Sequence, residues 1–320
     1  MNVAITGGGG FLGRRLSQAL LAEKGVGRIV LLDATPMGPS SGDSRVETRC
    51  ANLLDPGVAR SAVEAADVIF HLAAVVSGQA EAEFDLGMSV NLDATRSLLE
   101  AARATGRQPK FVFSSSLAVF GPPLPETVTD ETAVHPRSSY GAQKAVGELL
   151  VTDFSRRGFV DGRVLRLPTV CVRPGAPNAA ASSFVSGIIR EPLHGKRANC
   201  PVDPDTELWL SSPRAAVANL VHAASLPGEA LGQGRIINLP GITVRVCEMI
   251  EALARVAGRG VADLVSFNDD PGVRRIVSGW PARFDVSRAL DLGFVRDHDF
   301  SALIRDYLAR DESASAVRRA

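Results

Sequence analysis

The chain has 320 residues, of which 45% are hydrophobic and 22% are charged. This length and composition allow a full hydrophobic core, either in one large α/β domain or in a domain with a smaller lobe, and they exclude a disordered chain. The 35 basic and 35 acidic residues cancel, so no overall charge favours nucleic acid, and a small molecule is the expected partner.

The first half of the chain alternates buried strands with helices. Strands are predicted at residues 2–6, 28–33, 68–72, 110–114 and 163–167, and helices at 11–24, 58–65, 85–105 and from Tyr140 onward, after a Pro-rich loop at 122–137. The strands lack polar alternation, which indicates a parallel sheet covered on both faces and joined by right-handed crossovers.

The pattern changes after Pro168. Residues 169–184 (TVCVRPGAPNAAASSF) are rich in Pro, Ala, Asn and Ser, and a helix through Ile189 and a loop to about Thr206 follow. The chain is predicted to return to the sheet in segments 207–210, 215–224 and 235–239. Residues 243–309 are predicted to be mainly helical. We therefore predict a first domain at 1–167, rejoined by 207–240, and a smaller C-terminal substrate-binding lobe at 168–206 and 241–320.

No metal site, disulfide or membrane segment is expected. The four cysteines lie far apart, without a CxxC pair or a histidine at metal-ligand spacing. The sequence opens on a strand pattern instead of an apolar leader, and no later apolar run is long enough to cross a membrane. The expected location is the cytoplasm.

A glycine-rich turn joins the first strand to the first helix. In TGGGGFLG, the residues Gly7, Gly10 and Gly13 let the backbone approach a pyrophosphate, and the helix N-terminus stabilises its charge. Asp33 ends the second strand, where a carboxylate accepts hydrogen bonds from the adenosine ribose and disfavours a 2′-phosphate. The first domain is thus predicted to be a Rossmann-type doubly wound parallel sheet that binds NAD in preference to NADP.

Other positions are candidates for cofactor contact. Ala73 and Ala74 in HLAA are small enough for the ribose and phosphates to pass over them, although core packing explains them equally well. His71 is interpreted as a hydrogen-bonded, half-buried residue and not as a catalyst. The remaining candidates rest on their position along the chain: Phe11, Leu12, Asn52, Leu53 and Asn91.

Tyr140 and Lys144, in SSYGAQK, form the candidate catalytic pair. Their spacing puts both on one helical face, where the ammonium is expected to lower the phenol's pKa and give a phenolate near neutral pH. Alcohol oxidation needs such a base while hydride leaves the carbon. YxxxK alone is common on amphipathic helices, but here it follows both the glycine turn and the serine run FVFSSSLAVFG.

With these motifs in this order, the chain resembles the extended short-chain dehydrogenase/reductase family over nearly its whole length. TGGGGFLG, HLAA, NLDATRSLLEAA, FVFSSSLAVFG, SSYGAQK and LRLPTV carry the resemblance. It implies that Tyr140 takes the hydroxyl proton, Ser116 polarises the same oxygen and Lys144 bonds the nicotinamide ribose, while the first two serines of the run pack or bond to the backbone. Asn91 either supports this network or satisfies helix backbone.

The substrate region departs from the family's usual pattern. Thr169 stands where LRxxNVYGP has Asn, Arg173 adds a cation, and Arg214 replaces a usual acidic residue. An arginine fork suits a carboxylate, so an acid substrate is plausible, with Arg173 as the preferred clamp and Arg190 and Arg214 as competitors. The substrate candidates are Ser77, Ser116, Tyr140, Thr169, Arg173, Asn178 and Ser182.

The longest similarities are to one subgroup of the family. SSSLAVFG, SSYGAQK, RLPTVCVRPGAPNAAASSF and PVDPDTELWLSSPRAAVANL carry them. They imply oxidation of the C2 hydroxyl of a four-carbon sugar acid, D-erythronate to 2-dehydro-D-erythronate, with hydride transfer to NAD. A nucleotide-sugar 4-epimerase or dehydratase with tightly bound NAD stays open, as does a non-catalytic NAD-sensing protein, which would not need the base of YxxxK.

A homodimer is also expected, without a nucleic-acid or membrane partner. Family members often pair the helix near residue 85 with the helix that carries Tyr140 across a two-fold axis. In the latter helix Ala145, Val146, Leu149 and Leu150 extend beyond a sheet-facing stripe. The sequence has no basic patch and no amphipathic membrane anchor.

Overall fold

The computed structural model describes residues 1–38, 42–175 and 180–310. In these residues a seven-stranded sheet has the order β10-β6-β5-β4-β1-β2-β3, with parallel pairing throughout. Its strands are β1 (Asn2–Thr6), β2 (Arg28–Asp33), β3 (Val46–Cys50), β4 (Val68–His71), β5 (Lys110–Ser116), β6 (Asp161–Leu167) and β10 (Ile236–Asn238). The predicted Rossmann-type fold is confirmed.

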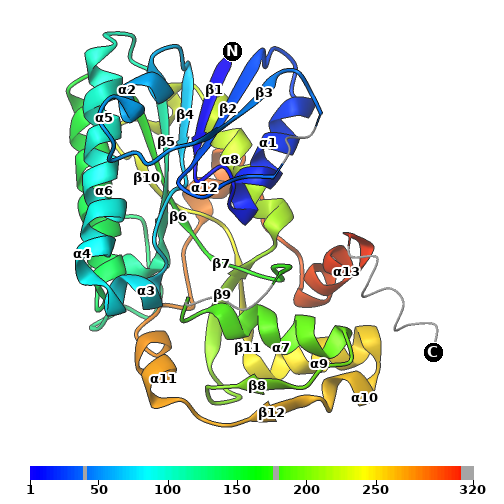
Figure 1. The fold of residues 1–320 in the computed structure, drawn as a ribbon. Helices are drawn as coiled ribbons and strands as arrows, with labels where there is room; N and C mark the ends of the chain where they lie inside the picture. The colour runs from blue at the N-terminus through cyan, green and yellow to red at the C-terminus, as the bar shows by residue number, and fades with distance from the viewer. Residues whose placement is uncertain (39–41, 176–179, 311–320) are drawn as a thin grey trace.

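Helices cover both faces of this sheet (Figure 1). On one face lie α2 (Val58–Val63), α5 (Ala94–Ala104) and α6 (Ser139–Arg156), and on the other α1 (Phe11–Ala22), α8 (Pro213–Ser225) and α12 (Ser287–Asp291). Apolar strand residues alternate between two cores: Phe111 and Phe113 pack under α5 and α6, whereas Val112 packs with Leu16 and Leu220 on the other face. Burial on both faces is why these strands are apolar at consecutive positions.

A smaller lobe lies beyond the carboxyl ends of the strands (Figure 1). It contains the sheets β11-β9-β7 and β12-β8 and has its own core, which includes Val185, Ile189, Met249 and Leu253. Its elements are β7 (Thr169–Val170), α7 (Ser183–Leu193), β8 (Ala198–Cys200), β9 (Glu207–Ser211), β11 (Ile242–Arg245), α9 (Val246–Ala257), α10 (Arg259–Ala262), β12 (Val265–Phe267), α11 (Pro271–Val277) and α13 (Phe300–Arg310). The cavity described below lies between the main sheet and this lobe.

Several elements differ from the sequence prediction, including the short strands β7 and β8 in segments predicted as loop and β11 and β12 in the segment predicted as mainly helical. The edge strand β3 was not predicted, because its sequence VETRC is mostly polar and partly exposed. The predicted return of 207–210 to the main sheet is wrong: β9 pairs with β7 and β11 in the smaller lobe, whereas α8 and β10 do return. The predicted helix at 85–105 is divided into α4 (Phe84–Gly87), a π-helical segment at Met88–Asp93 and α5.

The strand order places the ends of β1 and β4 side by side. From β1 the chain continues to β2 and β3 on one side and to β4, β5 and β6 on the other. Such a reversal leaves a crevice at the carboxyl ends of the strands, where open α/β sheets bind ligands. No helix in the described part of the chain is long and apolar enough to span a membrane.

Candidate active site

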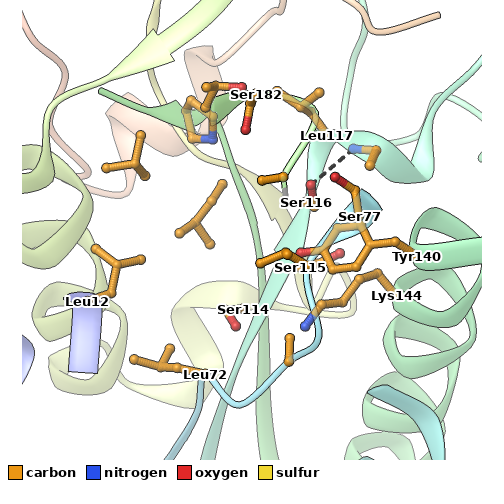
Figure 2. Close-up of a pocket in the computed structure, with 18 of the residues that line it drawn as sticks. Leu12, Leu72, Ser77, Ser114, Ser115, Ser116, Leu117, Tyr140, Lys144 and Ser182 are labelled. Carbon is orange, nitrogen blue, oxygen red and sulfur yellow. Dashed lines mark hydrogen bonds between the residues drawn. The ribbon is translucent and has the colours of Figure 1, made fainter. Parts of the chain in front are cut away.

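A cavity of about 400 Å³ opens at this crevice. It is lined by the turn after β1, the segment after β4, the end of β5, the first turns of α6 and the loop after β6. Figure 2 shows Ser116, Tyr140 and Lys144 on one side of it and Leu12 and Leu72 on the other. The parallel sheet therefore brings together motifs that lie more than a hundred residues apart in sequence.

The glycine turn forms a cradle with no room for side chains. Gly7 has a φ of +69°, and a Cβ there would lie 2.7 Å from the Ala73 backbone nitrogen; one on Gly13 would lie 2.4 Å from the Gly7 carbonyl oxygen. Gly10 caps α1 without a side-chain hydrogen bond, and the first turn has no acidic residue. The first backbone N–H groups of this helix are thus available to an anion, which fits the pyrophosphate of a dinucleotide.

Asp33 is held at the end of β2 beside this turn. Its Oδ2 accepts a hydrogen bond from the Gly9 backbone at 3.0 Å, and its Oδ1 accepts from the Thr35 N–H at 3.0 Å and the Thr35 hydroxyl at 2.8 Å. These bonds fix the carboxylate next to the dinucleotide cradle, where the adenosine ribose of a Rossmann fold is bound.

Ser116, Tyr140 and Lys144 come together as the sequence predicts. Ser116 ends β5, and its hydroxyl oxygen accepts the Ala118 N–H at 3.1 Å (Figure 2). Tyr140 lines the cavity together with Ser116, and the Lys144 Nζ lies 5.8 Å from the centre of the Tyr140 ring. Capping by Ser138, whose hydroxyl accepts the Gly141 N–H, starts α6 directly before Tyr140. The two hydroxyls and the ammonium therefore share one wall of the cavity.

The protonation of Tyr140 differs from the expectation. Burial raises the pKa of Tyr140 to about 12, and it outweighs the influence of the Ser116 hydroxyl and the charge of Arg173, which both lower this pKa. Burial also lowers the pKa of Lys144 to about 8, while Glu148 raises it. The prediction that Lys144 sets the phenol's pKa near neutrality is therefore wrong, because desolvation disfavours both charged forms.

His71 is hydrogen-bonded as predicted, but it is fully buried and not half-buried. Its Nδ1 lies 2.7 Å from the Thr6 hydroxyl and its Nε2 2.8 Å from the Thr95 hydroxyl. Burial, with a smaller effect of Lys144, lowers the pKa of His71 to about 3. The ring is neutral at physiological pH and joins β4 to β1 and α5, outside the cavity lining.

The other two serines of the run have different roles. The Ser114 hydroxyl donates to the His71 carbonyl at 3.0 Å, which agrees with the predicted bond to backbone. The buried Ser115 hydroxyl donates to a carboxylate oxygen of Glu148, a partner that the sequence did not indicate.

The remaining cofactor candidates divide into two groups. Phe11, Leu12 and Ala74 line the cavity. Ala73 lies outside the cavity lining, and its backbone packs closely against Gly7. Three other candidates also lie outside the lining. Asn52 is exposed and accepts the Leu54 N–H, Leu53 is buried in the core under α2, and Asn91 bonds both backbone groups of Val75 and the Gln143 side chain.

Most substrate candidates surround the same cavity. Ser77, Thr169, Arg173 and Ser182 line it with Ser116 and Tyr140, and the Ser77 hydroxyl also accepts the Ala181 N–H at 3.2 Å. Asn178 lies outside the described residues. This arrangement joins the segment after β4 to the loop after β6 beside the catalytic pair.

The structure separates the three candidate arginines. Arg173 lines the cavity, and no hydrogen bond or ion pair engages its guanidinium within the described residues. The Arg190 guanidinium is paired with Glu191 and donates to the Arg173 carbonyl at 2.8 Å. Arg214 is half exposed and paired with Asp306 at 2.9 Å and Asp297 at 3.5 Å. Of these three arginines, only Arg173 lines the cavity.

Sequence reasoning missed Trp280, which lines the cavity from the segment after α11. Its side chain is partly buried and packs against the cores of both the main sheet and the smaller lobe. A single tryptophan far from every recognised motif gives no sequence signal for this position. The described residues contain no group of three or more His, Cys, Asp or Glu side chains that could hold a metal ion.

Comparisons with known proteins agree with this geometry. The model of the NAD dependent epimerase/dehydratase family matches residues 3–210. The chain is 57% identical to a D-erythronate dehydrogenase of Cupriavidus necator, over 96% of this chain and 98% of that protein. It is 49% identical to a D-erythronate dehydrogenase of Haemophilus influenzae, over 97% of this chain and all of that protein.

Two solved structures share the fold. One, described as a nucleoside-diphosphate-sugar epimerase from Agrobacterium tumefaciens, superimposes with a TM-score of 0.92 at 45% identity and covers 97% of this chain and 94% of its own. The other, an L-threonine 3-dehydrogenase from Trypanosoma brucei, gives a TM-score of 0.87 at 28% identity and covers 96% of both chains. With its glycine cradle, serine run and YxxxK helix in one cavity, the chain belongs to the NAD dependent epimerase/dehydratase family.

Proposed function

We propose that this protein is an NAD-dependent dehydrogenase that oxidises the C2 hydroxyl of D-erythronate to give 2-dehydro-D-erythronate. The near full-length identity to two D-erythronate dehydrogenases supports the substrate. The observation that carries the proposal is the position of Arg173, which lines the cavity together with Tyr140 and whose guanidinium has no hydrogen-bond or ion-pair partner in the described residues. A planar guanidinium binds a carboxylate through two parallel hydrogen bonds.

In the proposed reaction, Tyr140 acts as a phenolate and accepts the proton of the substrate hydroxyl. Ser116, held by the Ala118 N–H, donates a hydrogen bond to the same substrate oxygen, and the Lys144 ammonium stabilises the phenolate. When bound in the glycine cradle, NAD supplies the acceptor for the hydride that leaves C2. The substrate thus loses one proton to Tyr140 and two electrons with the hydride, and its alcohol becomes a ketone.

Tyr140 must lose its proton before this step. Because burial raises its pKa, the neutral phenol dominates at pH 7, and the active fraction increases as pH rises towards that pKa. The cations that favour the phenolate are therefore part of the machinery: Arg173 already lowers the pKa of Tyr140, and Lys144 lies on the same helical face.

The decisive assay measures NADH formation by purified protein. We expect D-erythronate to support reduction of NAD, and L-threonate, hexuronates and UDP-sugars to support much less. The assay contains each compound in turn at equal concentration, with NAD or NADP. Absence of NADH with every sugar acid would contradict the proposed function.

A second candidate is a nucleotide-sugar epimerase, favoured by the description of the solved structure that is 45% identical to this chain. The same serine, tyrosine and lysine would serve that reaction, but NAD would be regenerated in each cycle. An epimerase would keep NAD through purification and interconvert a UDP-sugar without net NADH. The assay above, with analysis of the UDP-sugars after incubation, separates the two functions.

Asp33 is proposed to set the preference for NAD. In Asp33→Ala, we expect the ratio of kcat/KM with NAD to kcat/KM with NADP to fall by roughly tenfold, because the ribose loses an acceptor and a 2′-phosphate loses a repelling charge. Thr35→Val is the control, since it removes a hydroxyl that donates to Asp33 but leaves the carboxylate. An unchanged ratio in Asp33→Ala would refute this role.

A cytoplasmic homodimer completes the proposal. Val146 and Leu149 on α6 and Phe84 on α4 are exposed apolar side chains, whereas Ala145 is buried and Leu150 is partly buried against the core. Only part of the predicted apolar stripe is therefore available to a second copy of the chain. Sedimentation equilibrium measures whether the protein is a dimer, as proposed, or a monomer.

A further inference from the structure

A buried ion pair lies behind the catalytic wall. Glu148 is one helical turn beyond Lys144 on α6 and accepts two hydrogen bonds from Arg166 of β6, at 2.9 Å from Nε and 2.7 Å from Nη2. The side chains of Arg166 and Glu148 are only 4% and 3% exposed. The same carboxylate accepts a hydrogen bond from the Ser115 hydroxyl. Both of its oxygens are thus engaged, away from the cavity.

This carboxylate connects the elements that carry the catalytic groups. Ser115 precedes Ser116 on β5, while Glu148 follows Tyr140 and Lys144 at four-residue intervals on α6, so the three α6 side chains lie along one helical face. Arg166 is itself fixed, because its Nη1 donates to the Asp130 carbonyl at 3.3 Å and its guanidinium lies over the Phe120 ring. A shift of α6 along β5 would break the hydrogen bonds that Glu148 accepts from Ser115 and Arg166.

A gain in stability does not by itself explain why the Glu148–Arg166 ion pair is buried. Burying two charges costs several kcal/mol of desolvation, and well-packed apolar residues often serve as well or better. The pair lies against Ser115, the residue before Ser116, and one helical turn from Lys144, and this placement points to a role in the reaction.

Among the groups packed around Lys144, Glu148 carries a negative charge. The Nζ of Lys144 lies 4.7 Å from the centre of the Phe113 ring on β5, and on β4 it faces His71, which is neutral at physiological pH. Tyr140 and Glu148 flank it on α6, and Arg166 lies on β6 behind Glu148. Burial lowers the pKa of Lys144, and Glu148 is the group that raises it.

We propose that Glu148 is a positioning residue for the reaction: through Ser115 and Arg166 it fixes α6 against β5 and β6, and its negative charge offsets the burial of the Lys144 ammonium. The positioning part rests on the proposed function, in which Ser116 and Tyr140 act on one substrate oxygen. The electrostatic part is a property of the protein alone and is tested without substrate.

The electrostatic part is tested by titration of the lysines. The chain has only four lysines, Lys24, Lys110, Lys144 and Lys196, so NMR of lysine-labelled protein resolves them, and the spectrum of Lys144→Met assigns the signal. We expect Lys144 to titrate with a pKa of about 8 in the unsubstituted protein and roughly one unit lower in Glu148→Gln. An unchanged Lys144 titration in folded Glu148→Gln overturns this part of the proposal.

Two further variants control for misfolding and for a nonspecific effect on the pKa of Lys144. Glu148→Met combined with Arg166→Met leaves no unpaired buried charge, so it is expected to fold even if Glu148→Gln does not, and it should also lower the pKa of Lys144. Asp297→Asn is the matched control: Asp297 is a buried carboxylate that accepts from the Ser212 hydroxyl at 2.7 Å and pairs with Arg214, outside the cavity. An equal shift in Asp297→Asn would show a nonspecific effect and overturn the assignment.

The positioning part is tested with Ser115→Ala. This variant keeps the Glu148–Arg166 pair and removes only the bond between β5 and α6. We expect kcat with D-erythronate to fall roughly tenfold, because the two hydroxyls of the site lose their alignment, while the KM for NAD and the titration of Lys144 stay unchanged. A kcat equal to that of the unsubstituted protein overturns the positioning role. If no sugar acid is oxidised even by the unsubstituted protein, the proposed function fails, and the lysine titration still decides the electrostatic part.

Discussion

Replacing Tyr140 with phenylalanine is expected to lower kcat by about 10²- to 10⁴-fold, the usual contribution of general base catalysis. The substitution removes the oxygen that accepts the substrate proton and leaves the ring, so the cavity wall and the glycine cradle keep their shape. NAD affinity should therefore be nearly unchanged. Steady-state kinetics with D-erythronate gives kcat, and a binding titration with NAD gives the affinity of each protein.

The second tyrosine of the chain provides the control. Tyr307 lies in α13 of the smaller lobe, where its hydroxyl is 3.0 Å from the His194 Nε2, and it does not line the cavity. Tyr307→Phe is expected to keep kcat. Turnover in Tyr140→Phe comparable to that in Tyr307→Phe would remove Tyr140 from the mechanism. A loss of NAD binding together with kcat would instead indicate that the site had collapsed.

The parts of this site that sequence predicts are those in which a local pattern determines local geometry. The glycines of TGGGGFLG are needed because a Cβ on Gly7 or Gly13 would collide with backbone, and the spacing of Tyr140 and Lys144 fixes a shared helical face. The Rossmann-type sheet follows from apolar strands alternating with helices. Each of these features is encoded by a local sequence pattern, although the backbone that Gly7 approaches is that of Ala73, on a distant segment.

The features that sequence did not predict depend on contacts between distant segments. The β3 strand is polar because it lies at the sheet edge, so its pattern resembles that of a loop. The pairing of Glu148 with Arg166 joins a helix to a strand, and Trp280 reaches the cavity from the far end of the chain. None of these partners is specified by a motif.

The protonation states of Tyr140 and Lys144 also depend on contacts between distant segments of the chain. Four-residue spacing correctly places Lys144 near Tyr140, but the pKa of each group depends on how much water the folded chain removes from it. Burial raises the pKa of Tyr140 and lowers that of Lys144, opposite to the effect expected for Tyr140 from its neighbour alone. Arg173 and Glu148 oppose the effect of burial on the pKa values of Tyr140 and Lys144. Both residues lie outside the YxxxK motif.

Replacing Arg173 with methionine is expected to reduce kcat/KM for D-erythronate by roughly 10²-fold, mainly through KM. The substitution removes the charged fork and keeps an apolar stem of similar length, while the substrate carboxylate loses its partner in both the ground state and the transition state. Arg173→Lys should lose less, because an ammonium keeps the charge but not the two parallel hydrogen bonds. Steady-state kinetics over a wide range of D-erythronate concentrations separates KM from kcat.

Two comparisons make this result specific to carboxylate binding. Arg214→Met removes a cation of the same type that pairs with Asp297 and Asp306 outside the cavity, and its kinetics should match those of the unsubstituted protein. Erythritol, a four-carbon polyol without a carboxylate, should be a poor substrate for both the unsubstituted protein and Arg173→Met, because neither can gain from the clamp. If Arg173→Met keeps its KM for D-erythronate, or if it loses activity equally towards the acid and the polyol, Arg173 does not bind the carboxylate. The clamp would then have to come from outside the three arginines considered, since Arg190 and Arg214 are already paired.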